Sequence, residues 1–429
     1  MILACLVSLD AAGVCEAQWS AGDGAFPDAV ASAVCPAGAF AIANSPNAEG
    51  SASAAFDGTN YLVGIQGDQT THAAVTAQLV SPSGALVGPR ISTGRTGGFP
   101  FVVFDGTNYL MVWSNEETNL IDPIYGEFVS PSGALVGGPF LISQGAENEE
   151  AAGIVFEGTD YLVIYTTGPG GAGSGFTGPL SARFVSKAGT VGNEIVLMSS
   201  MGSRFELGIA FNGTNFLVAW WRDVSAPQTF PQNVVEARTV SRTGDLGSVV
   251  TVSSLMSPNG NTASVASDGT NFLVVWDPDM GPGPTESISR ETHGRVVTGT
   301  GGLLGPEFTI AGAPGKYQNP FASYGGGSYL VTWTDMTDRS NMDVSARFVS
   351  PSGTPTGSAF AITSCPGTQV ISPVVFGGGK FLVAWIDGAD PATGSGGDVL
   401  GTFVPPLQSG GHGVVPVPSP PVVPVDGRR

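Results

Sequence analysis

The sequence is poor in charge, and poorest in positive charge. Charged residues make up 12% of its 429 residues, and 16 Lys and Arg stand against 35 Asp and Glu, a net charge of −19. Nucleic acids and anionic lipid surfaces repel such a chain, so nucleic acid is not expected as a partner. The chain has no apolar run approaching the roughly 18 residues that cross a bilayer as a helix, so no membrane span is expected.

Cysteine is scarce as well. Four cysteines are too few for a disulfide-dense framework, and no two have the CxxC spacing of a structural zinc site. Two pairings are considered, Cys5–Cys15 and Cys35–Cys365. The second would staple the two ends of the repeat region, but the strand register proposed below puts Cys35 and Cys365 at opposite ends of neighbouring strands, which argues against it.

Motifs that carry chemistry are missing. The sequence contains no GxSxG nucleophile elbow and no Walker-type phosphate loop. Its three histidines, His72, His293 and His412, have no second histidine or cysteine at metal-ligand spacing, and we expect them to lie in loops. We therefore assign no catalytic residue, and no cofactor other than calcium is considered.

Glycine and proline are abundant. The 63 Gly and 32 Pro favour many tight turns over long helices, while the 42% of hydrophobic residues suffice for a large core. The glycines fall in a repeat. One segment recurs seven times: DGTNYLVGI at 57–65, DGTNYLMVW at 105–113, EGTDYLVIY at 157–165, NGTNFLVAW at 212–220, DGTNFLVVW at 268–276, GGGSYLVTW at 325–333 and GGGKFLVAW at 377–385.

Each repeat unit predicts four short strands. In the second unit these are Phe101–Phe104, Tyr109–Trp113, the GEFVS segment at 126–130 and Pro139–Ser143, separated by an Asp-Gly turn and a Ser-Pro-Ser-Gly turn. The second strand is apolar on both faces, as expected between stacked sheets. Seven units of four strands predict an all-β fold, a seven-bladed β-propeller of four-stranded antiparallel blades.

The last unit lacks a fourth strand. It has strands at 371–376, 380–386 and 398–404, and then the repeat stops. An N-terminal segment, Gly38–Ala43, matches the fourth strand Ser358–Thr363 of the preceding unit. We therefore predict that this N-terminal strand completes the seventh blade and closes the ring.

Three regions are predicted along the chain. Residues 1–33 precede the repeats and are either an irregular arm or the remnant of a secretory signal, because they begin with an apolar run but lack a basic start. Residues 34–411 form the propeller. Residues 412–429 form a Pro-rich tail that should be an extended spacer.

Candidate site residues come from the connections between second and third strands, which vary in length while the two turns of each unit stay nearly constant. Variable loops on a rigid scaffold are where recognition tends to reside. The candidate ligand-binding residues on these connections are Trp221, Arg222, Asp223, Phe230, Asp277, Asp279, Asp335 and Asp387. Asp277 and Asp279, which are followed by a glycine, also form a weak match to a calcium loop.

The paired signature of DGTNYLVVW-type and ARFVSPSG-type segments resembles a large group of bacterial secreted or surface repeat proteins, mostly uncharacterised. The resemblance covers residues 38–411 and implies a β-propeller exposed outside the cell. The matching residues belong to the scaffold, so it implies no activity.

Three functions are considered. The first is a secreted or cell-surface, non-enzymatic binding or adhesion module that recognises a glycan or a protein through the variable connections. The second is a polysaccharide lyase or hydrolase with carboxylates near the central channel. The third is a structural subunit of a surface layer or filament. The missing catalytic motifs favour the first.

Overall fold

The chain divides into two compact units, Met1–Val34 and Cys35–Arg429, and only the second contains described residues. The computed structural model describes residues 38–44, 49–50, 52–67, 74–115, 122–145, 147–168, 178–200, 207–225, 232–254, 260–278, 291–312, 316–338, 340–370, 373–388 and 397–407. The predicted N-terminal arm (1–33) and Pro-rich tail (412–429) lie outside them. Within these ranges we find no helix with the length and apolarity needed to cross a membrane.

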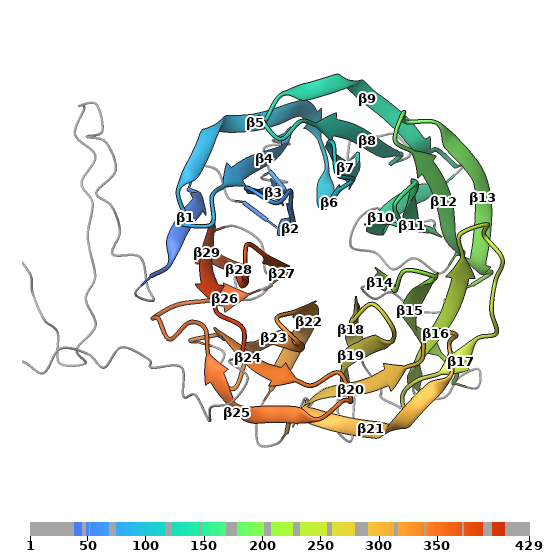
Figure 1. Cartoon of the computed structure of the whole chain (residues 1–429), viewed down its shortest axis with the longest axis vertical. Coiled ribbons are helices and arrows are strands. Elements are labelled where there is room, and N and C mark those ends of the chain that lie inside the picture. Colours follow the sequence, from blue (N-terminus) through green and yellow to red (C-terminus); the bar gives the residue numbers. More distant parts are fainter. Residues whose placement is uncertain are drawn as a thin grey trace, which may run out of the picture. The chain divides into compact units, whose positions relative to one another are not determined.

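Seven antiparallel sheets form a ring, which confirms the predicted propeller (Figure 1). In each blade the strands run from the innermost to the outermost. Blade 1 contains β2 (Ala52–Phe56), β3 (Tyr61–Ile65), β4 (Ala74–Val80) and β5 (Leu86–Thr96). Blade 2 contains β6 (Gly98–Phe104), β7 (Tyr109–Ser114), β8 (Ile124–Val129) and β9 (Leu135–Ser143). Blade 3 contains β10 (Asn148–Phe156), β11 (Asp160–Gly168), β12 (Leu180–Ser186) and β13 (Val191–Met198).

The next three blades repeat this order. Blade 4 contains β14 (Gly208–Phe211), β15 (Asn215–Asp223), β16 (Asn233–Ser241) and β17 (Val250–Thr251). Blade 5 contains β18 (Gly260–Ser267), β19 (Phe272–Pro278), β20 (Thr292–Val297) and β21 (Leu303–Ala311). Blade 6 contains β22 (Tyr317–Gly325), β23 (Ser328–Asp335), β24 (Asp343–Val349) and β25 (Pro355–Ala361).

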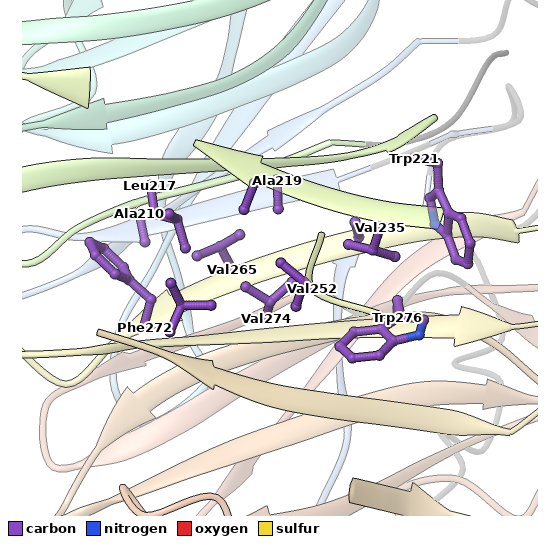
Figure 2. Close-up of a cluster of buried hydrophobic side chains, with 13 residues drawn as sticks. Ala210, Leu217, Ala219, Trp221, Val235, Val252, Val265, Phe272, Val274 and Trp276 are labelled. Carbon is purple, nitrogen blue, oxygen red and sulfur yellow. The ribbon is translucent and has the colours of Figure 1, made fainter. Parts of the chain in front are cut away.

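The second strand of each blade explains why the sheets stack. The side chains of β3, β7 and β19 are buried along their whole length. A strand that is apolar on both faces must be covered on both sides, and here a neighbouring blade covers each face. Seven inter-blade cores result, one at every junction around the ring. Figure 2 shows the core between blades 4 and 5, with Trp221 and Trp276 at one end and Phe272 at the other.

Blade 7 is built from both ends of the repeat region. It contains β26 (Gln369–Val370), β27 (Val374–Gly377), β28 (Lys380–Asp387), β29 (Asp398–Val404) and β1 (Phe40–Ala43). The innermost strand predicted at 371–376 is thus divided into β26 and β27, both of which pair with β28.

The predicted closing strand is confirmed. β1 pairs antiparallel with β29, so the N-terminal strand takes the outermost position of the blade. Its Ile42 and Ala43 are buried in the core between blades 7 and 1. The Phe40 ring lies against Gly84 of the blade 1 turn, where an added Cβ would come within 2.6 Å of it. β1 therefore packs as an ordinary fourth strand although no turn joins it to β29.

One cysteine is cross-linked near this closure. Cys365, between β25 and β26, is disulfide-bonded and 5% exposed. The chain's other cysteines, Cys5, Cys15 and Cys35, lie outside the described residues, and all three precede β1 in the sequence. The pairing Cys35–Cys365 considered from the sequence therefore has one end outside the described residues, and Cys5–Cys15 lies wholly outside them.

Candidate functional site

The two faces of the ring differ in how strictly they repeat. On one face, which we call the turn face, every blade pairs its first and second strands through two residues five positions apart, as in Phe56–Tyr61 and Phe104–Tyr109. In blades 6 and 7 one further pair, three positions apart, follows. On the other, the connection face, the last pairs between second and third strands are separated by eight positions in Asp335–Asp343 and by seventeen in Trp276–His293. The blades therefore differ from one another in the length of their connections on the connection face.

Hydrogen bonds within the turns and between neighbouring blades occupy the polar side chains of the turn face. Asp57 accepts hydrogen bonds from the amides of Thr59 and Asn60, both at 2.6 Å, which fixes the turn of blade 1. In the next junction, the Tyr161 hydroxyl of blade 3 donates to Asp105 Oδ2 of blade 2 at 2.7 Å. These polar groups are used within the scaffold, so we place the candidate site on the connection face.

The expectation that Trp221 is an exposed ligand contact is wrong. Its side chain is 0% exposed, it lies in the core between blades 4 and 5, and its indole N–H donates to the carbonyl oxygen of Thr262 at 3.2 Å. The strand β15 continues past the expected end of the repeat, so Trp221 is still inside the sheet stack. Its role is packing between blades.

Arg222 and Asp223 follow at the end of the same strand and reach the connection face. Arg222 Nη2 lies 2.7 Å from Glu236 Oε1, on the neighbouring strand β16. Asp223 Oδ1 accepts the amide of Ser225 at 2.8 Å. Partial burial acts to raise the pKa of Asp223, but the bonds from Ser225 and Gln232 outweigh it and lower the pKa below its usual value. Asp223 is therefore an anion at this rim at neutral pH.

Asp277 is buried and used internally, which corrects its assignment as a ligand contact. Its side chain is 0% exposed, and its two oxygens accept the backbone amides of Thr262 at 2.9 Å and of Asn319 at 3.4 Å. It thus links blades 5 and 6. The other proposed calcium ligand, Asp279, and the candidate Phe230 lie outside the described residues. No group of three or more His, Cys, Asp or Glu side chains suited to a metal ion occurs within the described ranges.

Asp387 belongs to a carboxylate pair at the end of blade 7. It is the cross-strand partner of Asp398, so the two side chains share one face of the sheet. Burial raises the pKa of Asp387, although the nearby polar groups of Gln369 and Trp385 act against the shift. Burial also raises the pKa of Asp398, and the nearby Glu49 and Asp387 add to it. A carboxyl group that is buried beside another carboxylate keeps its proton to a higher pH.

Asp335 occupies the equivalent place in blade 6. It is the cross-strand partner of Asp343, another acid, and its Oδ1 accepts the amide of Thr337 at 3.0 Å. Asp343 Oδ1 accepts the hydroxyl of Thr363 at 3.0 Å and the amide of Cys365 at 3.3 Å. Asp335 and Asp387 therefore each belong to a cross-strand pair of acids, and the two pairs lie on the adjacent blades 6 and 7. Arg222 and Asp223 lie on blade 4.

Further acids on this face are not among the candidate site residues. Glu49, next to the closing strand, is 2% exposed and accepts Arg90 Nη1 at 2.7 Å. Glu149 at the entrance of β10 is 4% exposed; burial raises its pKa, and Ser143 Oγ donates to it at 2.9 Å. Glu49 and Asp398 stand outside the repeated motif and carry no signal of their own. Asp398 could have been found as the expected cross-strand neighbour of Asp387.

His293 is not a loop residue, which corrects a further expectation. It lies in β20 opposite Trp276 and is 5% exposed, and both of its ring nitrogens are bonded to carboxylates. His72 and His412 lie outside the described residues.

Comparison with known proteins supports the fold and does not name a family. No family model matches the sequence, and no curated protein matches it. Among solved structures, hydrazine synthase of Kuenenia stuttgartiensis is similar with a TM-score of 0.50 at 9% identity, covering 89% of this chain and 99% of that one. Similarity at such low identity shows the fold alone.

Two other solved structures are similar at a lower score. The α-L-arabinanase of Penicillium chrysogenum gives a TM-score of 0.49 at 11% identity, covering 73% of this chain and 96% of its own. The β-propeller domain of the Trilobed protease from Pyrococcus furiosus gives 0.47 at 12% identity, covering 79% and 91%.

Proposed function

We propose that this propeller is a secreted or cell-surface binding module, without enzymatic activity, that recognises a glycan or a protein through its connection face. The observation that carries the proposal is the contrast between the faces. Every blade repeats its turn spacing, while the connections between second and third strands differ from blade to blade. A scaffold that is constant on one face and varied on the other presents a specific recognition surface.

Two further observations support this proposal. The disulfide at Cys365 is typical of an oxidising environment outside the cytosol. The rim of the connection face carries acids, among them Asp223, Asp335 and Asp387, so a ligand with hydroxyl or cationic groups suits it. With a net charge of −19, the module would associate faster with a cationic than with an anionic partner.

The test begins with the intact protein on glycan and protein arrays. A ligand found there should bind about tenfold more weakly to Asp335→Asn and Asp387→Asn, because each removes a carboxylate from the rim. Thr59→Ala and Thr270→Ala are matched controls, since both threonines are exposed on the turn face. Their affinity should equal that of the unchanged protein. An empty array, or binding that only the turn-face variants weaken, would contradict the proposal.

One observation favours a second candidate, a polysaccharide hydrolase or lyase. Glycoside hydrolysis uses two neighbouring carboxyl groups, one of them protonated, and Asp387 and Asp398 are such neighbours with raised pKa values. Under this candidate Asp387→Asn and Asp398→Asn should each abolish the release of new sugar ends from a polysaccharide. Degradation that survives both changes, or no degradation by the unchanged protein, would remove it.

A further inference from the structure

His293 lies between two carboxylates on the connection face of blade 5. Its Nδ1 lies 2.5 Å from Glu307 Oε1, and its Nε2 lies 2.8 Å from Glu291 Oε2. The imidazole also lies beside the Trp276 indole, with the ring centroids 6.1 Å apart. The side chain of Glu307 is 7% exposed and that of Glu291 is 21% exposed, so the cluster is mostly shielded from water.

Proton counting defines the charge of this cluster. An ionised carboxylate only accepts hydrogen bonds, so both ring nitrogens must carry a proton to satisfy both contacts. That form is the imidazolium. A neutral imidazole would turn a lone pair toward one of the carboxylates, and one contact would become repulsive. The geometry therefore selects a positively charged His293 between Glu291 and Glu307.

The same cluster joins the ends of two connections. Ser254, three residues after β17 of blade 4, donates from its amide and from its hydroxyl to Glu307 Oε2, both at 2.6 Å. In the sequence, Ser254 directly precedes the connection 255–259 and Glu291 directly follows the connection 279–290. The imidazolium thus ties Glu291, directly before β20 of blade 5, to Ser254 of blade 4 through Glu307.

Few other groups act on this histidine. Trp276 from β19 and Ser254 from blade 4 do not titrate in the relevant range. Arg295, two residues further along β20, donates to the carbonyl oxygens of Gly305 and Val252. Burial lowers the pKa of His293, but the bonds to Glu307 and Glu291 outweigh it and raise the pKa above 6.5. Burial acts to raise the pKa of Glu307, yet the bonds from His293 and Ser254 bring it below 4.5.

We propose that His293 is a pH-dependent anchor that holds Glu291 and Glu307 of blade 5 together, and through Glu307 holds Ser254 of blade 4, at acidic to neutral pH and releases them at alkaline pH. Its consequence for ligand binding rests on the proposed function. The device would keep the recognition surface ordered in mildly acidic surroundings, where most histidine switches open, because here the charged form makes the bonds.

The pH window follows from the two shifts. A group whose folded pKa is raised contributes stability in full below its unfolded value, and loses it as the pH rises through the folded value. His293 therefore contributes in full below pH 6.5 and loses its contribution above its raised pKa. Glu307 has a lowered pKa, so its contribution is full above 4.5 and is lost only as the pH falls through the lowered value.

The anchor can be tested on the full-length protein without any ligand. Histidine-labelled protein is titrated by NMR from mildly acidic to alkaline pH, and the His293 signals are assigned by their loss in His293→Gln. His293 should carry a proton on both nitrogens at neutral pH, and the amide proton of Ser254 should shift with the same midpoint. Glu307→Gln should lower the His293 midpoint. A His293 that titrates at or below the value of a free histidine would overturn the proposal.

A control variant separates the anchor from the fold and from the proposed function. Ser254→Ala removes only the hydroxyl bond to Glu307, so His293 should still titrate high while the protein folds normally. If arrays yield a ligand, its affinity should fall about tenfold between neutral and alkaline pH in the unchanged protein and stay level in His293→Gln. An affinity that does not change with pH would overturn the regulatory part. If no ligand binds on the arrays, the proposed function is contradicted, while the NMR titration of His293 still tests the anchor.

Discussion

The junction between blades 7 and 1 is held by other bonds than the three junctions 3–4, 4–5 and 5–6. In blades 4, 5 and 6 an arginine on the third strand donates to its own outermost strand and to the preceding blade. Arg295 Nε donates to the carbonyl oxygen of Gly305 at 3.1 Å, and its Nη1 donates to that of Val252 in blade 4 at 2.9 Å. Arg238 and Arg347 make the same pair of bonds.

The closing junction has no such arginine. Gln78 takes the position in blade 1, and its amide donates within its own blade, to the carbonyl oxygens of Leu79, Val87 and Gly88. The bonds across the junction come from elsewhere. The Tyr61 hydroxyl donates to the carbonyl oxygen of Gly377 at 2.6 Å, and Lys380 Nζ donates to that of Pro82 at 3.0 Å.

The difference shows where the ring needs reinforcement. At an ordinary junction the peptide chain itself continues from one blade to the next, so a few carbonyl bonds suffice to fix the angle. At the closing junction the chain also continues, from β1 to β2, but no turn joins β1 to β29, so β1 belongs to blade 7 only through pairing and packing. There the pairing of β1 with β29 and the shared core take over the role of the missing turn.

The largest effect should come from the disulfide. Cys365→Ser removes the disulfide, and loss of a native disulfide destabilises a fold by on the order of 4 kcal/mol. Denaturant unfolding should show a lower midpoint in the variant, and reductant should bring the unchanged protein to the same value. The variant itself should not respond to reductant. Equal midpoints with and without reductant would mean that the fold holds without the link.

The next effect should come from β1. Ile42 and Ile142 occupy equivalent places on outermost strands, are 1% and 3% exposed, and face inter-blade cores. Each change to alanine leaves a cavity that costs about 3 kcal/mol. Ile42→Ala should also speed protease cleavage near β1, because that strand has no turn to hold it in place, whereas Ile142→Ala should not affect cleavage there. Equal cleavage of both variants would show that β1 is as firmly held as β9.

Much of this ring could be predicted from the sequence because the scaffold repeats. The constant turn spacing gave the blades, and the missing fourth strand gave the closure. The sequence also contains a correlation between neighbouring blades.

Where the turn of one blade begins with Asp, the second strand of the next blade begins with Tyr; these pairs are Asp57 with Tyr109, Asp105 with Tyr161 and Asp268 with Tyr329. Where the turn begins with Glu, Asn or Gly, the aromatic residue is Phe; these pairs are Glu157 with Phe216, Asn212 with Phe272 and Gly325 with Phe381. The exception is Tyr61, which follows Gly377 around the ring.

The candidate site could be predicted only in outline. Trp221 looked exposed because it follows the repeat, yet in a strand covered on both faces alternation carries no information about exposure. His293 looked like a loop residue because β20 begins two residues before the GRVV segment. The bonds of Asp277 and of Glu307, the partner of His293, join different blades, and contacts between units leave no mark on the spacing within one unit.

The smallest effect should come from the arginine bonds. Arg295→Met keeps the apolar stem but removes the donors to Gly305 and Val252, and the loss should cost about 1 kcal/mol because the carbonyl groups can turn to water. Arg295→Lys should not restore it, since one ammonium cannot reach two carbonyls in the fixed geometry of a guanidinium. Gln78→Ala at the closing junction is the matched control and should leave the bonds across that junction intact, because Gln78 donates within its own blade. If Arg295→Met instead destabilised the fold as much as Ile42→Ala, ordinary junctions would depend on side-chain bonds as heavily as the closing one depends on β1, and the contrast between them would fail.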